Sequence, residues 1–129
     1  MTGFVTRILA GTAEATAPDG TEVRLLAATT RGSMAHFSLA AGKVSIAVAH
    51  RTVDEVWYFI SGRGRMWRKL DGNEETLAVH AGVSISIPAG TRFQFRCDGA
   101  DALQAIGVTM PPWPGMDEAY EVQGVWQAN

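Results

Sequence analysis

Apolar and polar residues alternate along most of this chain with a period of two, which is the pattern of β-strands that bury one face. Glycines recur roughly every eight to twelve residues between Gly32 and Gly107 and separate the alternating stretches. No long stretch has a helical period, and only a brief helical turn is expected, at residues 12–16. The pattern therefore predicts an all-β sandwich or barrel of antiparallel strands. Its strands are expected at residues 21–28, 34–40, 43–49, 55–61, 64–70, 75–79, 83–87, 92–97 and 103–110.

Turn residues divide these strands, and the chain changes character near its C-terminus. The sequence Asp71-Gly-Asn tolerates the positive φ angles of tight turns, so it is expected to join the strands at 64–70 and 75–79 as a hairpin. The sequence that begins at Pro111 has too few N–H donors for regular sheet and opens a tail rich in proline and tryptophan at residues 111–129. No linker interrupts the pattern, so residues 1–129 are expected to form a single domain.

The composition is that of a globular protein: 129 residues, of which 47% are hydrophobic and 19% charged, with a formal net charge of −2. No cluster of basic residues indicates a nucleic-acid partner, and no apolar run approaches the roughly 20 residues of a membrane span. The first residues lack the basic-then-apolar pattern of a secretion signal. Cys97 is the only cysteine, which excludes an internal disulfide and favours a reducing compartment. We therefore expect a cytoplasmic protein.

Two segments, at residues 42–62 and 82–97, carry glycines and polar residues at fixed spacing. The first follows the pattern G-x5-H-x-H-x3,4-E-x6-G, with His50 and Glu55 in place and Val48 where the first histidine would stand. The second follows G-x5-P-x-G-x2-H-x3-N, with Phe93 at the histidine position and Cys97 at the asparagine position. Seven of the ten fixed positions match.

These motifs resemble the two signature motifs of the cupin superfamily, and the chain is similar to its small single-domain members. The resemblance implies a jelly-roll barrel, the double-stranded β-helix of cupins, with a pocket between two sheets. It also implies a homodimer and a divalent metal (Fe, Mn, Ni or Zn) held by three histidines and a glutamate. Only His50 and Glu55 remain of that ligand set, so the metal site is expected to be degenerate unless His36 or Cys97 completes it.

His50 and Glu55 are the candidate catalytic residues, on strands predicted to be neighbours. As a functional pair, Glu55 would hold His50 in one tautomer while His50 acts as a general acid or base. The alternative is structural, because a buried histidine and a buried carboxylate can satisfy each other's polarity. The sequence leaves both interpretations open.

The candidate ligand-binding residues are predicted from the alternation around this pair. Trp57 and Phe93 are expected to face inward and form an aromatic wall for an apolar, aromatic or sugar ligand, although ordinary core packing would place them there too. Arg65 is either a clamp for a carboxylate or phosphate, or a solvated arginine paired with an acid of the neighbouring strand. Trp67 and His36 complete the candidate set.

The motifs and the candidate residues are compatible with three functions. The first is a protein that binds a small molecule without a tightly bound metal and uses His50 and Glu55 for isomerisation, epimerisation or lyase chemistry. The second is a metal-dependent enzyme of the dioxygenase kind with a recruited third ligand. The third is a non-enzymatic sensing or accessory module. Fold alone cannot choose among them, because jelly-roll barrels carry many unrelated chemistries.

Overall fold

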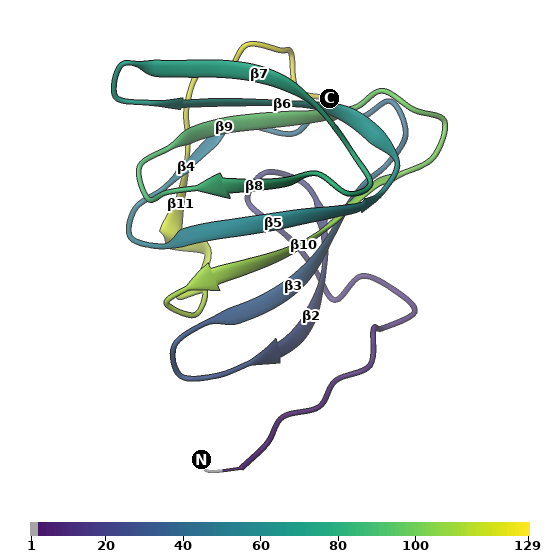
Figure 1. Ribbon diagram of the computed structural model, residues 1–129, viewed down its shortest axis with the longest axis vertical. Helices are drawn as coiled ribbons and strands as arrows, with labels where there is room; N and C mark the ends of the chain where they lie inside the picture. The colour runs from purple at the N-terminus through teal and green to yellow at the C-terminus, as the bar shows by residue number, and fades with distance from the viewer. Residues whose placement is uncertain (1–2) are drawn as a thin grey trace.

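The structure, a computed structural model, describes residues 3–129, and two antiparallel sheets face each other across its interior (Figure 1). One sheet has six strands in the order β1-β2-β3-β10-β5-β8, and the other has five in the order β11-β4-β9-β6-β7. The strands are β1 (Ala15–Thr16), β2 (Glu22–Ala28), β3 (Ser33–Leu39), β4 (Val48–His50), β5 (Asp54–Ser61), β6 (Arg63–Leu70), β7 (Asn73–His80), β8 (Ser84–Ile87), β9 (Arg92–Cys97), β10 (Leu103–Met110) and β11 (Ala119–Glu121). This is the predicted all-β jelly roll.

The period-two pattern explains which side chains enter the interior. Along β5, Glu55, Trp57 and Phe59 are buried while the residues between them are exposed, as the alternation of side chains along a strand requires. The predicted hairpin is present: β6 and β7 pair antiparallel from Arg63–His80 to Leu70–Asn73, and Asp71 adopts a φ of 54° in the turn between them.

The last glycine of the first motif has a structural reason. Gly62 adopts a φ of +81°, and a Cβ atom there would lie 2.3 Å from the backbone oxygen of Ala102. The turn between β5 and β6 therefore requires a residue without a side chain.

Two sequence predictions about elements are wrong. Residues 43–49 do not form a full strand, since only Val48–His50 pairs in the sheet and the preceding residues make a single bridge, between Val44 and Arg96. The backbone of residues 43–47 instead forms hydrogen bonds with several separate segments, and one of them runs from Ile46 N to Asp19 O. Residues 12–16 do not form a helical turn, because Ala15–Thr16 pairs with β2.

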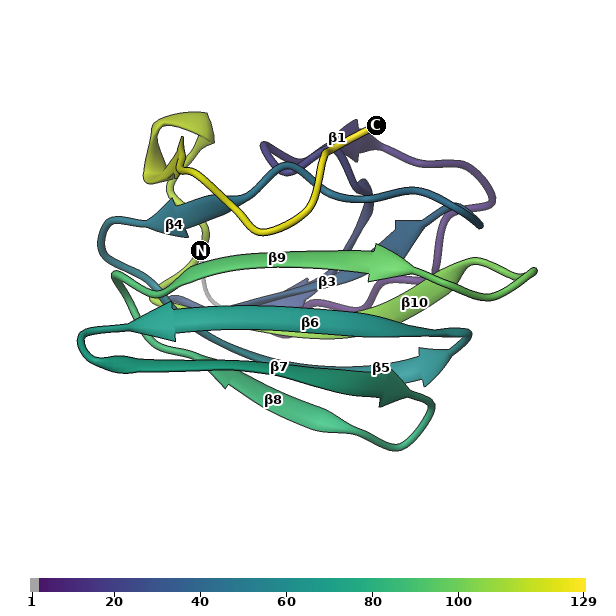
Figure 2. The same cartoon turned by 90° about the horizontal axis from the view of Figure 1, so that it is seen from above.

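The tail does not extend the sheet at once but returns to the barrel. After the short 3-10 helix η1 (Met116–Glu118), β11 pairs with β4. The last residues then run beside the five-stranded sheet, as the yellow stretch in Figure 2 shows. They cover its outer face, where the Gln94 side chain bonds to the backbone of Val125 and Trp126. Within residues 3–129 no helix is long and apolar enough to cross a membrane.

Candidate functional site

A cavity of about 440 Å³ opens between the sheets at the end of the barrel where β4 ends and β5 begins. Both sheets, the turn before β2 and the start of the tail contribute to its wall. This volume is within the range of small-molecule sites in proteins. Most of the lining is apolar, and its polar side chains are few: Arg7, Thr16, Asp19, Ser33, His50, Glu55 and Thr109.

His50 and Glu55 meet on this cavity, although they are not on paired strands as predicted. His50 ends β4 in the five-stranded sheet and Glu55 lies on β5 in the six-stranded sheet, so the short connection between them crosses from one sheet to the other. Their side chains are 7% and 2% exposed, and His50 Nδ1 lies 2.8 Å from Glu55 Oε2. The pairing of these two residues follows from the turn between the sheets and not from strand pairing.

The polar atoms of this pair have each other as a close polar neighbour. His50 Nδ1 and Glu55 Oε2 are 2.8 Å apart, the distance of an ion pair, and beyond this contact neither buried atom has a hydrogen-bond partner among residues 3–129. The other carboxylate oxygen, Oε1, accepts a hydrogen bond of 3.1 Å from Trp57 Nε1, which orients Glu55. Buried polar atoms with few partners are costly in folded proteins, so a ligand that forms hydrogen bonds with this pair would gain from binding.

Aromatic rings surround the imidazole of His50. Its ring makes edge-to-face contacts with Phe93 at 5.2 Å and with Trp113 of the tail at 5.0 Å between centroids. Trp57 contacts Phe93 at 5.9 Å and stacks on Phe37 at 5.0 Å. The structure thus places Trp57 and Phe93 on the cavity wall, as predicted, and adds Trp113 and Phe37; their role in binding remains a prediction.

Asp19 is a site residue that the sequence pattern did not reveal. It lines the cavity and is 6% exposed. Its Oδ1 accepts hydrogen bonds from Thr21 N at 3.1 Å and from the Thr21 hydroxyl at 2.7 Å. Burial raises the pKa of Asp19 above its ordinary value of 3.8; the bonds from Thr21 and the charge of His50 oppose this shift, and the charge of Glu55 adds to it. In the sequence, Asp19-Gly20 has only the appearance of an exposed turn.

Two of the predicted metal or ligand contacts do not reach the cavity. His36 points to the outer face of the six-stranded sheet, where its Nε2 lies 2.7 Å from Gln104 Oε1. Cys97 is buried at the opposite end of the barrel, with its Sγ 3.1 Å from the backbone oxygen of Asp101. Strand β9 is the reason for the second error: Phe93 and Cys97 share a face, but four residues of strand separate them by about 13 Å.

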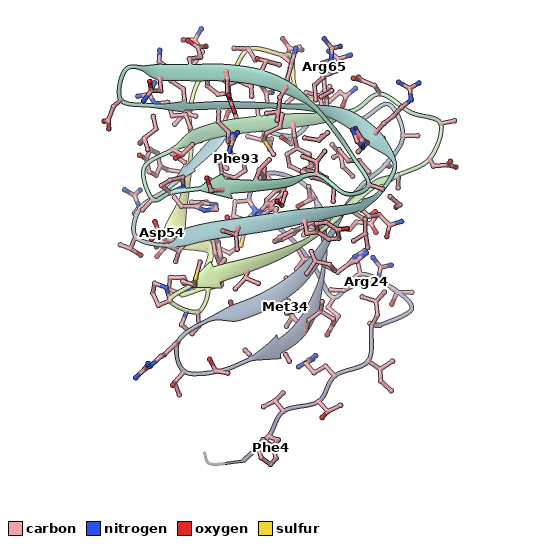
Figure 3. All side chains as sticks on the ribbon, viewed as in Figure 1. Phe4, Arg24, Met34, Asp54, Arg65 and Phe93 are labelled. Carbon is pink, nitrogen blue, oxygen red and sulfur yellow. The ribbon has the colours of Figure 1, made fainter. Side chains whose placement is uncertain are left out.

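Arg65 and Trp67 are also outside the cavity, because they lie on the outer face of the five-stranded sheet. Figure 3 shows Arg65 at the outside of the molecule and Phe93 in its interior. Arg65 Nε pairs with Asp98 Oδ2 at 3.1 Å, and Trp67 Nε1 donates a bond of 2.8 Å to Glu74 Oε2. Of the two roles considered for Arg65, its outward position agrees with the solvated, paired arginine and not with a clamp in the cavity, and its partner is Asp98 instead of an acid on β7.

The residues of the site do not fit a resident metal. Among residues 3–129 no three or more histidine, cysteine, aspartate or glutamate side chains converge where they could hold a metal ion. Catalytic zinc sites use three protein ligands, whereas this site presents His50 and Glu55 as its convergent pair. The hydrocarbon side chains of Val48 and Phe93, at the positions where cupins carry histidines, are on the cavity wall.

Solved structures with the same fold include short and long proteins. A Bacillus halodurans protein aligns with 77% of this chain and 76% of its own, at 22% identity and a TM-score of 0.63. An uncharacterised conserved protein with a double-stranded β-helix domain from Klebsiella pneumoniae subsp. pneumoniae covers 93% of this chain and 100% of its own, at 15% identity and a TM-score of 0.69. The Bacillus subtilis oxalate decarboxylase, described with Mn(II) centres, matches at 18% identity and a TM-score of 0.70 over 86% of this chain and 30% of the enzyme.

These identities show a shared fold and nothing more specific. No curated protein matches the sequence. The family model described as "Cupin domain" matches residues 35–109, which is more than half of the chain and includes both motifs. The motifs, the two facing sheets and the family match agree, and the chain belongs to the cupin family.

Proposed function

We propose that this protein binds a small organic molecule in the cavity and acts on it by acid–base chemistry, with His50 and Glu55 as the reacting pair and without a tightly bound metal. One observation carries the proposal: His50 and Glu55 are buried on a mainly apolar cavity with Nδ1 and Oε2 2.8 Å apart, so that an acid–base pair lies on the wall of a space large enough for a small molecule.

The geometry supports a proton transfer within one molecule. Trp57 holds Glu55 through Oε1, so Oε2, which lies beside His50, is the oxygen that would take or give a proton at the ligand. His50, in contact with that oxygen and enclosed by Phe93 and Trp113, is the second group able to carry the proton. In an isomerisation or epimerisation, a proton leaves one position of the ligand and returns to it or to another, so no further reactant is consumed.

A metal-dependent reaction is the second candidate function, and the residues give it less support. The Mn(II) centres belong to the oxalate decarboxylase. In this chain His36 and Cys97, the residues considered for a third ligand, lie outside the cavity.

Replacing His50 by glutamine tests the proposal. The readout is deuterium incorporation from solvent into an aromatic ketone such as phenylacetone, followed by NMR. General acid–base groups contribute roughly 10²–10⁴-fold to a rate, so we expect a loss of this size with little change in melting temperature. His80→Gln, the same substitution at an exposed histidine, is the matched control and should exchange at the wild-type rate.

Two results would count against the proposal. A His50→Gln protein with wild-type exchange would remove His50 from the reaction. A large fall in melting temperature together with lost exchange would favour the structural interpretation of the pair.

A further inference from the structure

The buried carboxyl groups on the cavity wall are acidic, whereas an anionic substrate would need cationic partners. Asp19 and Glu55 both lie on the cavity wall and are buried, and the charge of Glu55 acts on Asp19. Arg7, which also lines the wall, lies in a partly exposed ion pair with Glu14, 3.2 Å away. His50 is already beside Glu55. Among residues 3–129 no lysine lines the cavity, so a carboxylate or phosphate would find no free cation from this part of the chain.

The open oxygen of this acidic wall points to a ligand. Glu55 is 3% exposed and lines the cavity, and beyond the contact with His50 Nδ1 at 2.8 Å its Oε2 has no hydrogen-bond partner among the described residues. A charge in such a place is costly unless an opposite charge or several hydrogen bonds compensate it. An ammonium group supplies both, since it carries a positive charge and up to three N–H donors.

The rings around the acidic groups suit the same ligand. Trp57, Phe93 and Trp113 enclose the space beside His50 and Glu55. The faces of aromatic rings attract cations, most strongly where water is excluded. The rest of the wall is mainly aliphatic, with Val23, Leu25 and Met34 from the first strands, and accepts a hydrocarbon body. A molecule that is apolar over most of its surface and cationic at one end matches both parts.

From this arrangement we infer that the ligand of the cavity is a lipophilic organic cation, an amine whose ammonium group contacts Glu55 and Asp19 and whose apolar body fills the cavity toward β2 and β3. The inference rests on the proposed function only in that the cavity binds a small molecule. It does not require a reaction. It also separates this chain from its structural neighbour that is named for oxalate, a dianion.

The test compares three probes of nearly equal shape: 2-phenylethylamine, 2-phenylethanol and phenylacetate. Binding is measured by calorimetry and by the fluorescence of the tryptophans. We expect the amine to bind at least about tenfold more tightly than the alcohol, which is about 1.4 kcal/mol, and phenylacetate to bind more weakly than either. Glu55→Gln should remove most of the preference for the amine, while Glu121→Gln, at an exposed glutamate, should leave it unchanged.

A second readout follows the proton on Asp19. A cation nearby favours the ionised carboxylate, so amine binding should lower the pKa of Asp19 and release a proton to the buffer. The groups that face Asp19 are Glu55, His50 and Thr21. Calorimetry in two buffers with different heats of ionisation, repeated over a series of pH values upward from 3.8, measures the released protons, and Asp19→Asn should reduce the release that the wild type shows in this series. Equal release by this variant and the wild type would overturn the contact with Asp19.

The outcomes separate this inference from the proposed function. Equal binding of all three probes, or tighter binding of phenylacetate, would overturn the cationic ligand and leave a binding cavity in place. If none of the three probes binds, both the cationic ligand and the proposed function are overturned. Amine binding that survives in a protein without proton-exchange activity would support the cationic ligand and contradict the acid–base proposal.

Discussion

The two ends of the barrel interior are built from the same strands but differ in what fills them. At the end where β5 finishes, Phe59, Cys97 and Leu103 pack against one another with almost no exposure. At the end where β5 begins, the wall is also apolar, but it encloses a cavity and three buried ionisable side chains: Asp19, His50 and Glu55. The first end is a packed hydrophobic core, whereas the second has a cavity and buried polar groups in place of packed side chains.

The difference indicates that the cavity end reduces stability and the packed end provides it. A packed ring loses both transfer energy and contacts when it is removed, because the surrounding structure relaxes only in part. A ring beside a cavity has fewer contacts to lose. Buried carboxylates without full hydrogen bonding add a cost at the cavity end only. Substitutions at both ends of the barrel interior test this difference.

Truncating one phenylalanine at each end should separate the two regions most clearly. Phe59→Ala, at the packed end, is expected to lower the free energy of unfolding by about 3–5 kcal/mol. Phe37→Ala, on the cavity wall and partly exposed, should cost less than about 2 kcal/mol. Urea unfolding of both variants provides the measurement. Equal losses would mean that the cavity is filled by packing in solution.

Glu118 attaches the tail to the cavity end and should give the next largest effect. It accepts bonds from Thr52 N, the Thr52 hydroxyl and Val53 N, and it follows closely after Trp113, which contacts His50. Glu118→Gln weakens these charge-assisted bonds and is expected to cost about 2 kcal/mol. Glu121→Gln, the same change at an exposed residue, is the control and should cost less than about 0.5 kcal/mol.

The pH dependence of this attachment has a defined sign. Burial by itself would raise the pKa of Glu118, but the bonds from Thr52 and Val53 outweigh it and lower the pKa below the ordinary 4.5. Stabilisation by Glu118 is therefore present above pH 4.5 and is lost as the pH falls below that value. Thermal unfolding should show this loss in the wild type and less of it in Glu118→Gln. A wild type and a variant with parallel pH profiles would contradict the role of Glu118.

Asp19 should give the smallest effect, and in the opposite direction. Its pKa is raised mainly by burial, so the ionised form disfavours folding once the pH rises above the ordinary value of 3.8. Asp19→Asn keeps an acceptor for Thr21 and removes the charge. The variant should melt at a higher temperature than the wild type at pH 8 and show a smaller difference at pH 4. Asp101→Asn, at an exposed aspartate, should show no such trend, and a destabilised Asp19→Asn protein at pH 8 would argue against a costly charge.

Much of the architecture follows from local sequence because strand alternation and turn residues act over short distances. The hairpin at Asp71 and the inward row of Glu55, Trp57 and Phe59 on β5 follow from this alternation. The predicted strands agree with the structure to within one or two residues except at 43–49, where bonds to Asp19 and to other separate segments replace regular pairing.

The composition of the site depended on contacts that alternation cannot reveal. A period of two shows which residues share a face but not which face is inside when both faces are covered. On β6, Met66 faces the core and Trp67 lies on the outer face, yet both are buried. The same ambiguity left open the orientation of Arg65 and, on β3, of His36, which is buried on the outer face.

The amino-acid sequence alone determined the all-β cupin fold, and its motif spacing singled out His50 and Glu55, while their meeting across the turn between the two sheets was decided by the tertiary structure. Only the tertiary structure decided that Asp19 joins them, that Trp113 covers His50, and that His36, Arg65, Trp67 and Cys97 lie elsewhere. The physical reason is distance along the chain: contacts between far segments depend on how whole sheets and the tail close on each other, and no local pattern encodes that closure.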